Sequence, residues 1–158
     1  MMKLKFITWI PAVFIMVVIF NFSANSAAES DGSSLQIANV FLNLYESVHG
    51  EELSDNYKEN ILLHANYIIR KMAHAIEYVV LSLCIGIHLL ACRVSCKRLF
   101  FFSVIISGIY AITDEFHQLF VAGRCGRISD VLIDTVGAMI GAAFFLLVLR
   151  CFQKRATR

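Results

Sequence analysis

Four apolar runs of membrane-spanning length constrain this chain of 158 residues more than any other feature. About 20 apolar residues cross the hydrocarbon core of a bilayer, and the core helices of soluble proteins rarely need so long a run. The only proline, Pro11, lies in the first run, so none interrupts the later three. The sequence therefore predicts an all-α polytopic membrane protein with four transmembrane helices, at residues 6–22, 72–92, 99–121 and 131–149.

The basic residues are unevenly divided among the segments between these spans. The N-terminus, the connection 93–98 and the C-terminal tail hold nine of the 14 basic residues and none of the 12 acidic ones. Basic residues are retained on the cytoplasmic side of a membrane. We therefore expect both termini and the 93–98 connection to be cytoplasmic, and the other two connections to face outward. A basic tail can also bind nucleic acid, but four apolar spans argue against such a partner.

The first apolar run has a second interpretation as a cleaved signal peptide. Lys3 and Lys5 precede it, and a segment of small residues, Ala24-Asn25-Ser26, follows. The run is long for a signal peptide, and Trp9 and Pro11 lie within it. A retained membrane helix is favoured, and cleavage within residues 1–26 remains the alternative.

The connection 23–71 is long enough to hold structure of its own. Its first part, 23–34, is small and polar, which predicts a loop. Apolar residues then recur at helical spacing over 37–48, which predicts an amphipathic helix on the outer membrane surface. Asn56, with Glu59 three residues later, predicts the start of a second helix that continues into the second span.

Ionisable residues gather at one level of the predicted bundle. They lie at the start of the second span, the end of the third and the start of the fourth, and these three positions coincide because successive helices alternate in direction. Charged residues within spans are rare and indicate function by default. The predicted polar outer site comprises Arg70, Lys71, His74, Glu77, Tyr78, Asp114, Glu115, His117, Gln118, Arg124, Asp130 and Asp134.

Helical phase places these side chains on three faces that can bury one another. On the third span Ser103, Ser107, Tyr110, Asp114 and Gln118 form one polar stripe. On the fourth, the spacing of Gly137 and Gly141 permits close approach of another helix. We expect Glu77 and Asp114 to pair with bases drawn from Arg70, Lys71 and Arg124. The alternative is that the whole cluster only holds the bundle together.

The same residues resemble the VanZ-like family of bacterial membrane proteins, over about residues 20–141. Three stretches carry the resemblance: Arg70-Lys71-x-x-His74-x-x-Glu77-Tyr78, Tyr110-Ala111-x-x-Asp114-Glu115-x-His117-Gln118-x-Phe120, and Gly123-Arg124 followed by Asp130-x-x-x-Asp134-x-x-Gly137. Asn21-Phe22-Ser23 resembles the family's Phe-Ser motif after the first span. Ala122-Gly123 departs from the common Pro-Gly, which affects the turn. The resemblance implies a single four-helix domain in the bacterial cytoplasmic membrane, and the family's named member is associated with teicoplanin resistance.

Three classes of function are compatible with this pattern. The favoured hypothesis is an envelope role in which the outer site binds a membrane lipid, a cell-wall precursor or a glycopeptide antibiotic, since mixed basic and acidic groups suit a phosphorylated or zwitterionic headgroup. The second is a membrane enzyme, because His74, Glu77, Asp114, Glu115 and His117 include candidate metal ligands and acid–base groups. The third is a proton- or ion-coupled transporter, in which a homo-oligomer would supply a relay of ionisable groups through the membrane. No sequence motif specifies a cofactor, a metal or an oligomeric state.

Overall fold

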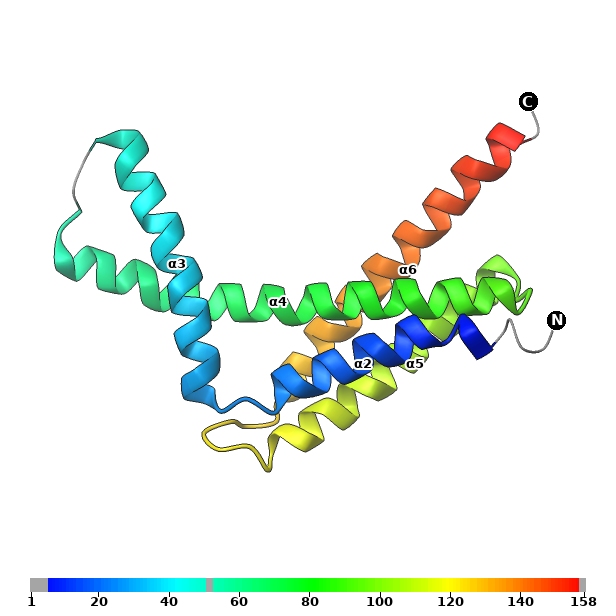
Figure 1. Cartoon of the computed structure of the whole chain (residues 1–158), viewed down its shortest axis with the longest axis horizontal. Helices are drawn as coiled ribbons and strands as arrows, with labels where there is room; N and C mark the ends of the chain where they lie inside the picture. The colour runs from blue at the N-terminus through cyan, green and yellow to red at the C-terminus, as the bar shows by residue number, and fades with distance from the viewer. Residues whose placement is uncertain (1–5, 51–52, 157–158) are drawn as a thin grey trace.

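The computed structural model describes residues 6–50 and 53–156, and these residues form five helices with no strand (Figure 1). The helices are α2 (Ile10–Ser23), α3 (Ala27–His49), α4 (Asp55–Ala91), α5 (Cys96–Gln118) and α6 (Ile128–Ala156). Each of α4, α5 and α6 is long and apolar enough to cross a membrane. The bent pair of α2 and α3 meets the same criteria jointly, which gives up to four spans. The predicted fold class, an all-α polytopic membrane protein, is confirmed.

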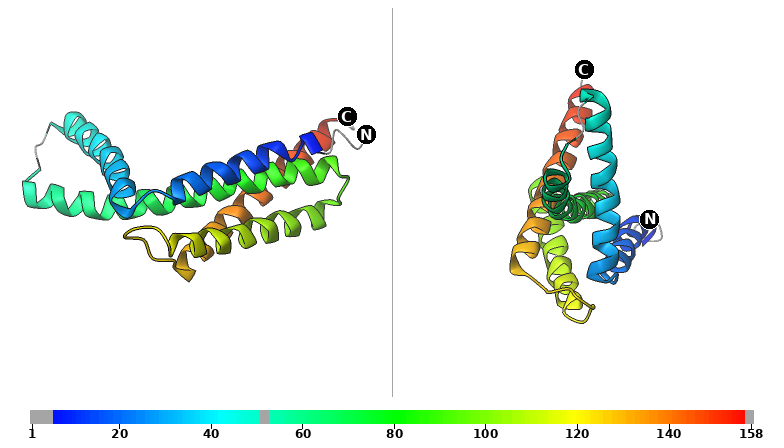
Figure 2. Two further views of the ribbon diagram at one scale, coloured as in Figure 1. Left: turned by 60° about the horizontal axis from the view of Figure 1, so that its bottom comes forward. Right: turned by 90° about the vertical axis from the view of Figure 1, so that its left-hand side faces the viewer.

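The connections lie at two ends of the bundle, as Figures 1 and 2 show. The start of α2, the connection between α4 and α5 and the end of α6 are at one end, which we call the basic end. The α2–α3 connection and the α5–α6 loop are at the other, which we call the polar end. The basic connection 93–98 and the described part of the basic C-terminal tail therefore lie at the same end of the bundle, whereas Lys3 and Lys5 lie outside the described residues. Which side of the membrane that end faces remains the prediction made from the charge distribution.

Two glycines let α6 approach α4 with almost no space between the backbones. A Cβ atom on Gly137 would collide with the carbonyl oxygen of Ala75, and one on Gly141 would collide with the Ser82 hydroxyl and the Val79 carbonyl. Helices in membranes associate through small residues of this kind because lipid gives no hydrophobic drive between them. The predicted packing role of these glycines is therefore confirmed, and α4 with α6 forms the tightest contact of the bundle.

Helix α2 is an integral part of the core. Ala12 and Ile19 are fully buried. The Tyr110 hydroxyl donates to the Met16 carbonyl at 2.6 Å and ties α5 to α2. At the basic end the Trp9 ring lies edge-on to His88 of α4, with centroids 4.7 Å apart. The described helix has 14 residues, about 21 Å at 1.5 Å per residue, which is shorter than a bilayer core of about 30 Å.

The prediction of a loop over 23–34 was wrong for most of that segment. Helix α3 begins at Ala27, and Ser26 caps it. The Ser26 hydroxyl accepts from the Glu29 backbone N–H at 3.3 Å, and the Glu29 carboxylate accepts from the Ser26 N–H at 2.8 Å. This reciprocal capping box satisfies two backbone donors that would otherwise lack partners. The helix predicted over 37–48 is present as the later part of α3, which ends at His49 and is capped by Gly50 in a left-handed conformation.

Helix α4 is continuous from Asp55 to Ala91, as expected for a helix that runs into the second span. It begins one residue before Asn56, with Ser54 at the cap position. Its 37 residues measure about 55 Å, nearly twice the thickness of a bilayer core. Helix α3 turns by 102° from α2 and crosses the first half of α4 (Figure 1). We call α3 together with residues 55–69 of α4 the α3–α4 arm.

Candidate functional site

The polar faces predicted on α4, α5 and α6 meet at the polar end of the bundle. Tyr78 and Asp134 are fully buried there, and Asp114, Glu115 and Gln118 are each at most 5% exposed. Ser103 and Ser107 continue the buried stripe of α5 toward the basic end. The expectation that the three polar faces bury one another is therefore confirmed for these residues.

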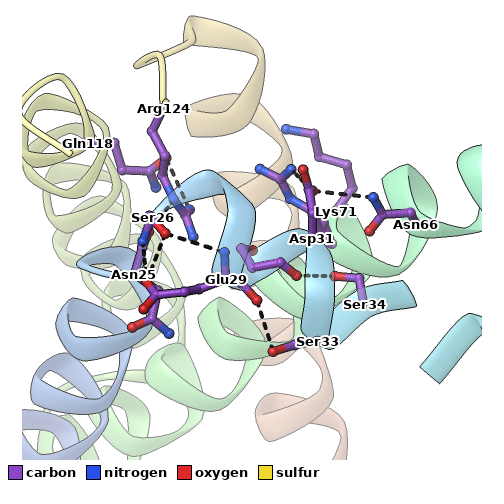
Figure 3. A network of polar contacts seen from close by, with 12 residues as sticks. Asn25, Ser26, Glu29, Asp31, Ser33, Ser34, Asn66, Lys71, Gln118 and Arg124 are labelled. Atoms are coloured by element: carbon purple, nitrogen blue, oxygen red, sulfur yellow. Dashed lines mark hydrogen bonds and ion pairs between the residues drawn. The ribbon is translucent and has the colours of Figure 1, made fainter. Parts of the chain in front are cut away.

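Two ion pairs connect α4 to its neighbours at this end. Arg70 binds Asp31 of α3, which also accepts from the Asn66 amide at 3.2 Å (Figure 3). Lys71 binds Asp130 at the start of α6. The first pair joins α3 to α4, and the second joins the start of α6 to α4.

The predicted partners of Glu77 and Asp114 were wrong, because Arg70 and Lys71 are paired with Asp31 and Asp130 instead. Among the described residues, the basic group within ion-pair distance of Glu77 is His74 of its own helix, with Nδ1 and Oε2 3.6 Å apart. Asp114 accepts from the Gln118 amide at 3.3 Å. Phase along a helix identifies which side chains share a face, but it does not specify the rotamers that decide their partners.

Arg124, in the α5–α6 loop, reaches across the polar end to α2. Its Nε donates to the Asn25 carbonyl at 2.8 Å, and its two Nη atoms donate to Gln118 Oε1 and the Phe22 carbonyl, both at 3.4 Å. All three acceptors are neutral, and no carboxylate forms an ion pair with Arg124 in residues 6–50 and 53–156. Burial, followed by repulsion from Arg70, lowers the pKa of the Arg124 guanidinium below its usual value. The group nevertheless stays charged, because an arginine is not deprotonated under ordinary conditions.

The α5–α6 loop is shaped by short contacts to the end of α5. The Arg127 backbone N–H donates to Glu115 Oε2 at 2.8 Å. Gly126 lies against Leu119 and the Glu115 carbonyl so closely that a Cβ atom would not fit. Gly123 has a φ of +72°, which a side chain other than glycine would strain. Ala122, where the resembling family commonly has proline, accepts through its carbonyl from the Ala27 N–H at 3.1 Å.

Several buried polar atoms at this end have no hydrogen-bond partner in the described chain. They are Glu77 Oε2, Asp114 Oδ1, both Asp134 carboxyl oxygens, the Tyr78 hydroxyl and His74 Nδ1. The same set includes His117 Nδ1, Ser23 Oγ and Asn66 Oδ1. The His117 ring lies against Phe20 of α2, with centroids 4.4 Å apart. Within the described residues, no three histidine, cysteine, aspartate or glutamate side chains are arranged to hold a metal ion.

Two polar cavities adjoin this cluster and share Arg70, His74 and Arg124 in their walls. The first polar cavity, of about 320 Å³, lies between α3, α4 and the end of α2, and Glu77 lines it. The second, of about 270 Å³, lies beside the α5–α6 loop and is lined by Lys71, Arg127 and Asp130. Residues of the predicted site therefore face open space rather than only one another.

Three residues of the site were missed in the sequence analysis: Asn25, Asp31 and Asn66. Asp31 was missed because its Ser- and Gly-rich surroundings favoured a loop. The capping-box pattern at Ser26 and Glu29 was available to indicate that Asp31 lies in the first turns of a helix. For Asn25 no side-chain pattern could help, because its contribution is a backbone carbonyl.

Comparison with known proteins identifies the family. Among curated proteins and solved structures, none matches the chain. A model of the VanZ/LLP1 family matches residues 8–149, which include three of the four apolar segments in full, all but the first two residues of the other, and every residue of the polar end. The chain is therefore a member of the VanZ/LLP1 family.

Proposed function

We propose that this protein acts in the bacterial cytoplasmic membrane, where its polar end faces outward and binds the anionic headgroup of an envelope lipid or a lipid-linked cell-wall precursor. By doing so it contributes to resistance against glycopeptides of the teicoplanin type. Membership of the VanZ/LLP1 family supports the envelope role. The observation that carries the proposal is Arg124, a cation that borders both polar cavities and has no carboxylate partner in the described chain.

Arg124 is the group that favours an anion at this position, because the nearby carboxylates of Asp31, Asp114 and Glu115 form no ion pair with it. Arg70 and Lys71 are each neutralised by an aspartate, so neither attracts a further negative charge strongly. Arg124 donates only to neutral oxygens. Arginine binds phosphate through two parallel hydrogen bonds, and such a charge-assisted pair is roughly twice as strong as a neutral hydrogen bond. A phosphate in either cavity would replace the long 3.4 Å contacts of the Nη atoms with shorter ones.

The test is the conservative change Arg124→Lys, which retains the positive charge but cannot form two parallel hydrogen bonds to one phosphate. We expect a fluorescent phosphatidylglycerol to bind the purified full chain about tenfold more weakly, and teicoplanin resistance of cells to fall at equal membrane abundance. Arg98→Lys at the basic end is the matched control. Unchanged lipid binding in Arg124→Lys would refute the proposal.

A second candidate, a membrane enzyme, is favoured by one observation. His74 and Glu77 lie 3.6 Å apart in the wall of the first polar cavity, as an acid–base pair would. The substitutions His74→Gln, Glu77→Gln and Asp114→Asn separate the two functions when membrane abundance is normal. A binding site predicts graded losses of resistance, whereas catalysis predicts that each change abolishes it. Sensitivity to a chelator would then assign the chemistry to a metal.

A further inference from the structure

Beside the first polar cavity lies a larger, apolar groove that the headgroup proposal does not use. It has a volume of about 560 Å³ and runs between the later part of α3 and the first half of α4. Its walls are made of aliphatic and aromatic residues without a single charge: Ala38, Phe41, Tyr45, Tyr57, Ile61 and Ala65 are among them. Small-molecule sites have volumes of about 300–1,000 Å³, and this groove falls within that range.

The groove belongs to the part of α4 that precedes the predicted membrane segment 72–92. Phe41 is 64% exposed there and Tyr57 is 57% exposed. Charged residues, Asp55, Lys58 and Glu59, surround the start of α4. A contiguous apolar surface at a polar, charged part of a protein marks a place where something binds.

The groove adjoins the first polar cavity, and α3 is joined to α4 beyond the other end of the groove. Ile69 lines both spaces, and Ile37 of the cavity adjoins Ala38 of the groove. At the other end Glu46 binds Lys58 at 3.0 Å and accepts from the Leu53 N–H at 2.9 Å, which joins α3 to α4 beyond the groove. The first polar cavity, which Arg70 and Arg124 line, and the apolar groove are therefore neighbours along α3 and α4.

The length of the groove fits one hydrocarbon chain. Tyr57 and Ile69, at its two ends, are 12 residues apart on one straight helix, which is about 18 Å at 1.5 Å per residue. One leaflet of a bilayer is about 15 Å thick in its hydrocarbon part, which is the length of one lipid chain. We infer that the ligand is a phosphate-bearing lipid, with its phosphate at Arg124 and one hydrocarbon chain in the groove of the α3–α4 arm.

This inference rests on the proposed headgroup function and adds the class of ligand: a lipid, not a free phosphate. The probe is a phosphatidylglycerol with a diazirine at the end of one acyl chain, presented to the purified full chain in phosphatidylcholine nanodiscs. After illumination, labelled peptides are mapped by mass spectrometry. We expect labels within residues 38–45 and 57–69. Ala65→Trp, which fills the groove, should reduce these labels about tenfold.

Leu63→Trp is the matched control, because Leu63 is on the same helix, is 59% exposed and does not line the groove. It should leave the labelling unchanged. A short-chain phosphatidylglycerol that is soluble in water separates the two proposals. Its binding should be weakened by Arg124→Lys and unaffected by Ala65→Trp.

Three results would overturn the inference. Equal groove labelling in Ala65→Trp and the unaltered chain would show that the chain is not held there. Inorganic phosphate that binds as tightly as the long-chain lipid would show that the chain adds nothing. Disulfide-linked dimers of Ile61→Cys in the presence of the lipid would show that a second copy covers the groove. In each case a loss of headgroup binding in Arg124→Lys would leave the proposed function standing.

Discussion

The carboxylates of the polar end differ in whether a cation faces them. Asp130 binds Lys71, and Asp31 binds Arg70. Asp134 is fully buried, and neither of its oxygens has a partner in the described chain. Removing one member of a buried ion pair leaves an uncompensated charge, whereas replacing an unpaired acid by its amide leaves no charge behind. Two aspartates four residues apart on α6 are therefore expected to respond to the same substitution with very different losses of stability.

We predict that Asp130→Asn lowers the free energy of unfolding by about 2–4 kcal/mol, because it strands Lys71. Asp134→Asn is expected to change it by less than about 1 kcal/mol. Thermal unfolding of the purified protein in detergent measures both. The double change Lys71→Met with Asp130→Leu should recover most of the loss. Equal losses in the two single variants would contradict this account.

At the scale of the helices, the sequence predicted the apolar helices α4, α5 and α6 well and the polar first part of α3 poorly. The length of the apolar runs located α4, α5 and α6, because the outward-facing and core-facing side chains of a spanning helix together make one long apolar run. The segment around Ser30 and Gly32 was predicted as a loop because serine and glycine have low helix propensity. In the structure a cap at Ser26 starts the helix, and Ser34 and Ala38 bury their small side chains. Local propensity was overridden by capping and tertiary packing.

The contact between α4 and α6 gives the second prediction. Gly141→Ala introduces a methyl group where Val79 and Ser82 leave no room, so we expect a loss of about 1–3 kcal/mol in unfolding free energy. Gly32→Ala in α3 is the matched control. No atom lies within 4 Å of its Cβ position, and alanine favours the helix by about 1 kcal/mol.

Thermal unfolding in detergent compares the two alanine variants directly. A stable Gly141→Ala protein would mean that α4 and α6 can separate at little cost, and the close glycine contact would then have no structural role. A destabilised Gly32→Ala protein would indicate that the α3–α4 arm has a partner at that position.

At the scale of the whole molecule, the cysteines report which end faces outward. Cys125 is exposed in the α5–α6 loop at the polar end, and Cys96 and Cys151 are exposed toward the basic end. If the basic end is cytoplasmic, a membrane-impermeant maleimide should label Cys125 in intact cells and label the other two only after permeabilisation. Variants that retain one cysteine each make the assignment unambiguous. Labelling of Cys151 in intact cells would reverse the predicted topology.

The ion pair between Lys71 and Asp130 also has a consequence for the time course of synthesis. Its two residues are 59 positions apart, so Lys71 is made long before its carboxylate. At about 5–20 residues per second, roughly 3–12 s pass between the two. Arg70 meets no such delay, because Asp31 precedes it in the chain. During those seconds a lysine at the membrane boundary has no native counter-charge, so α4 reaches its final position only when α6 arrives beside it.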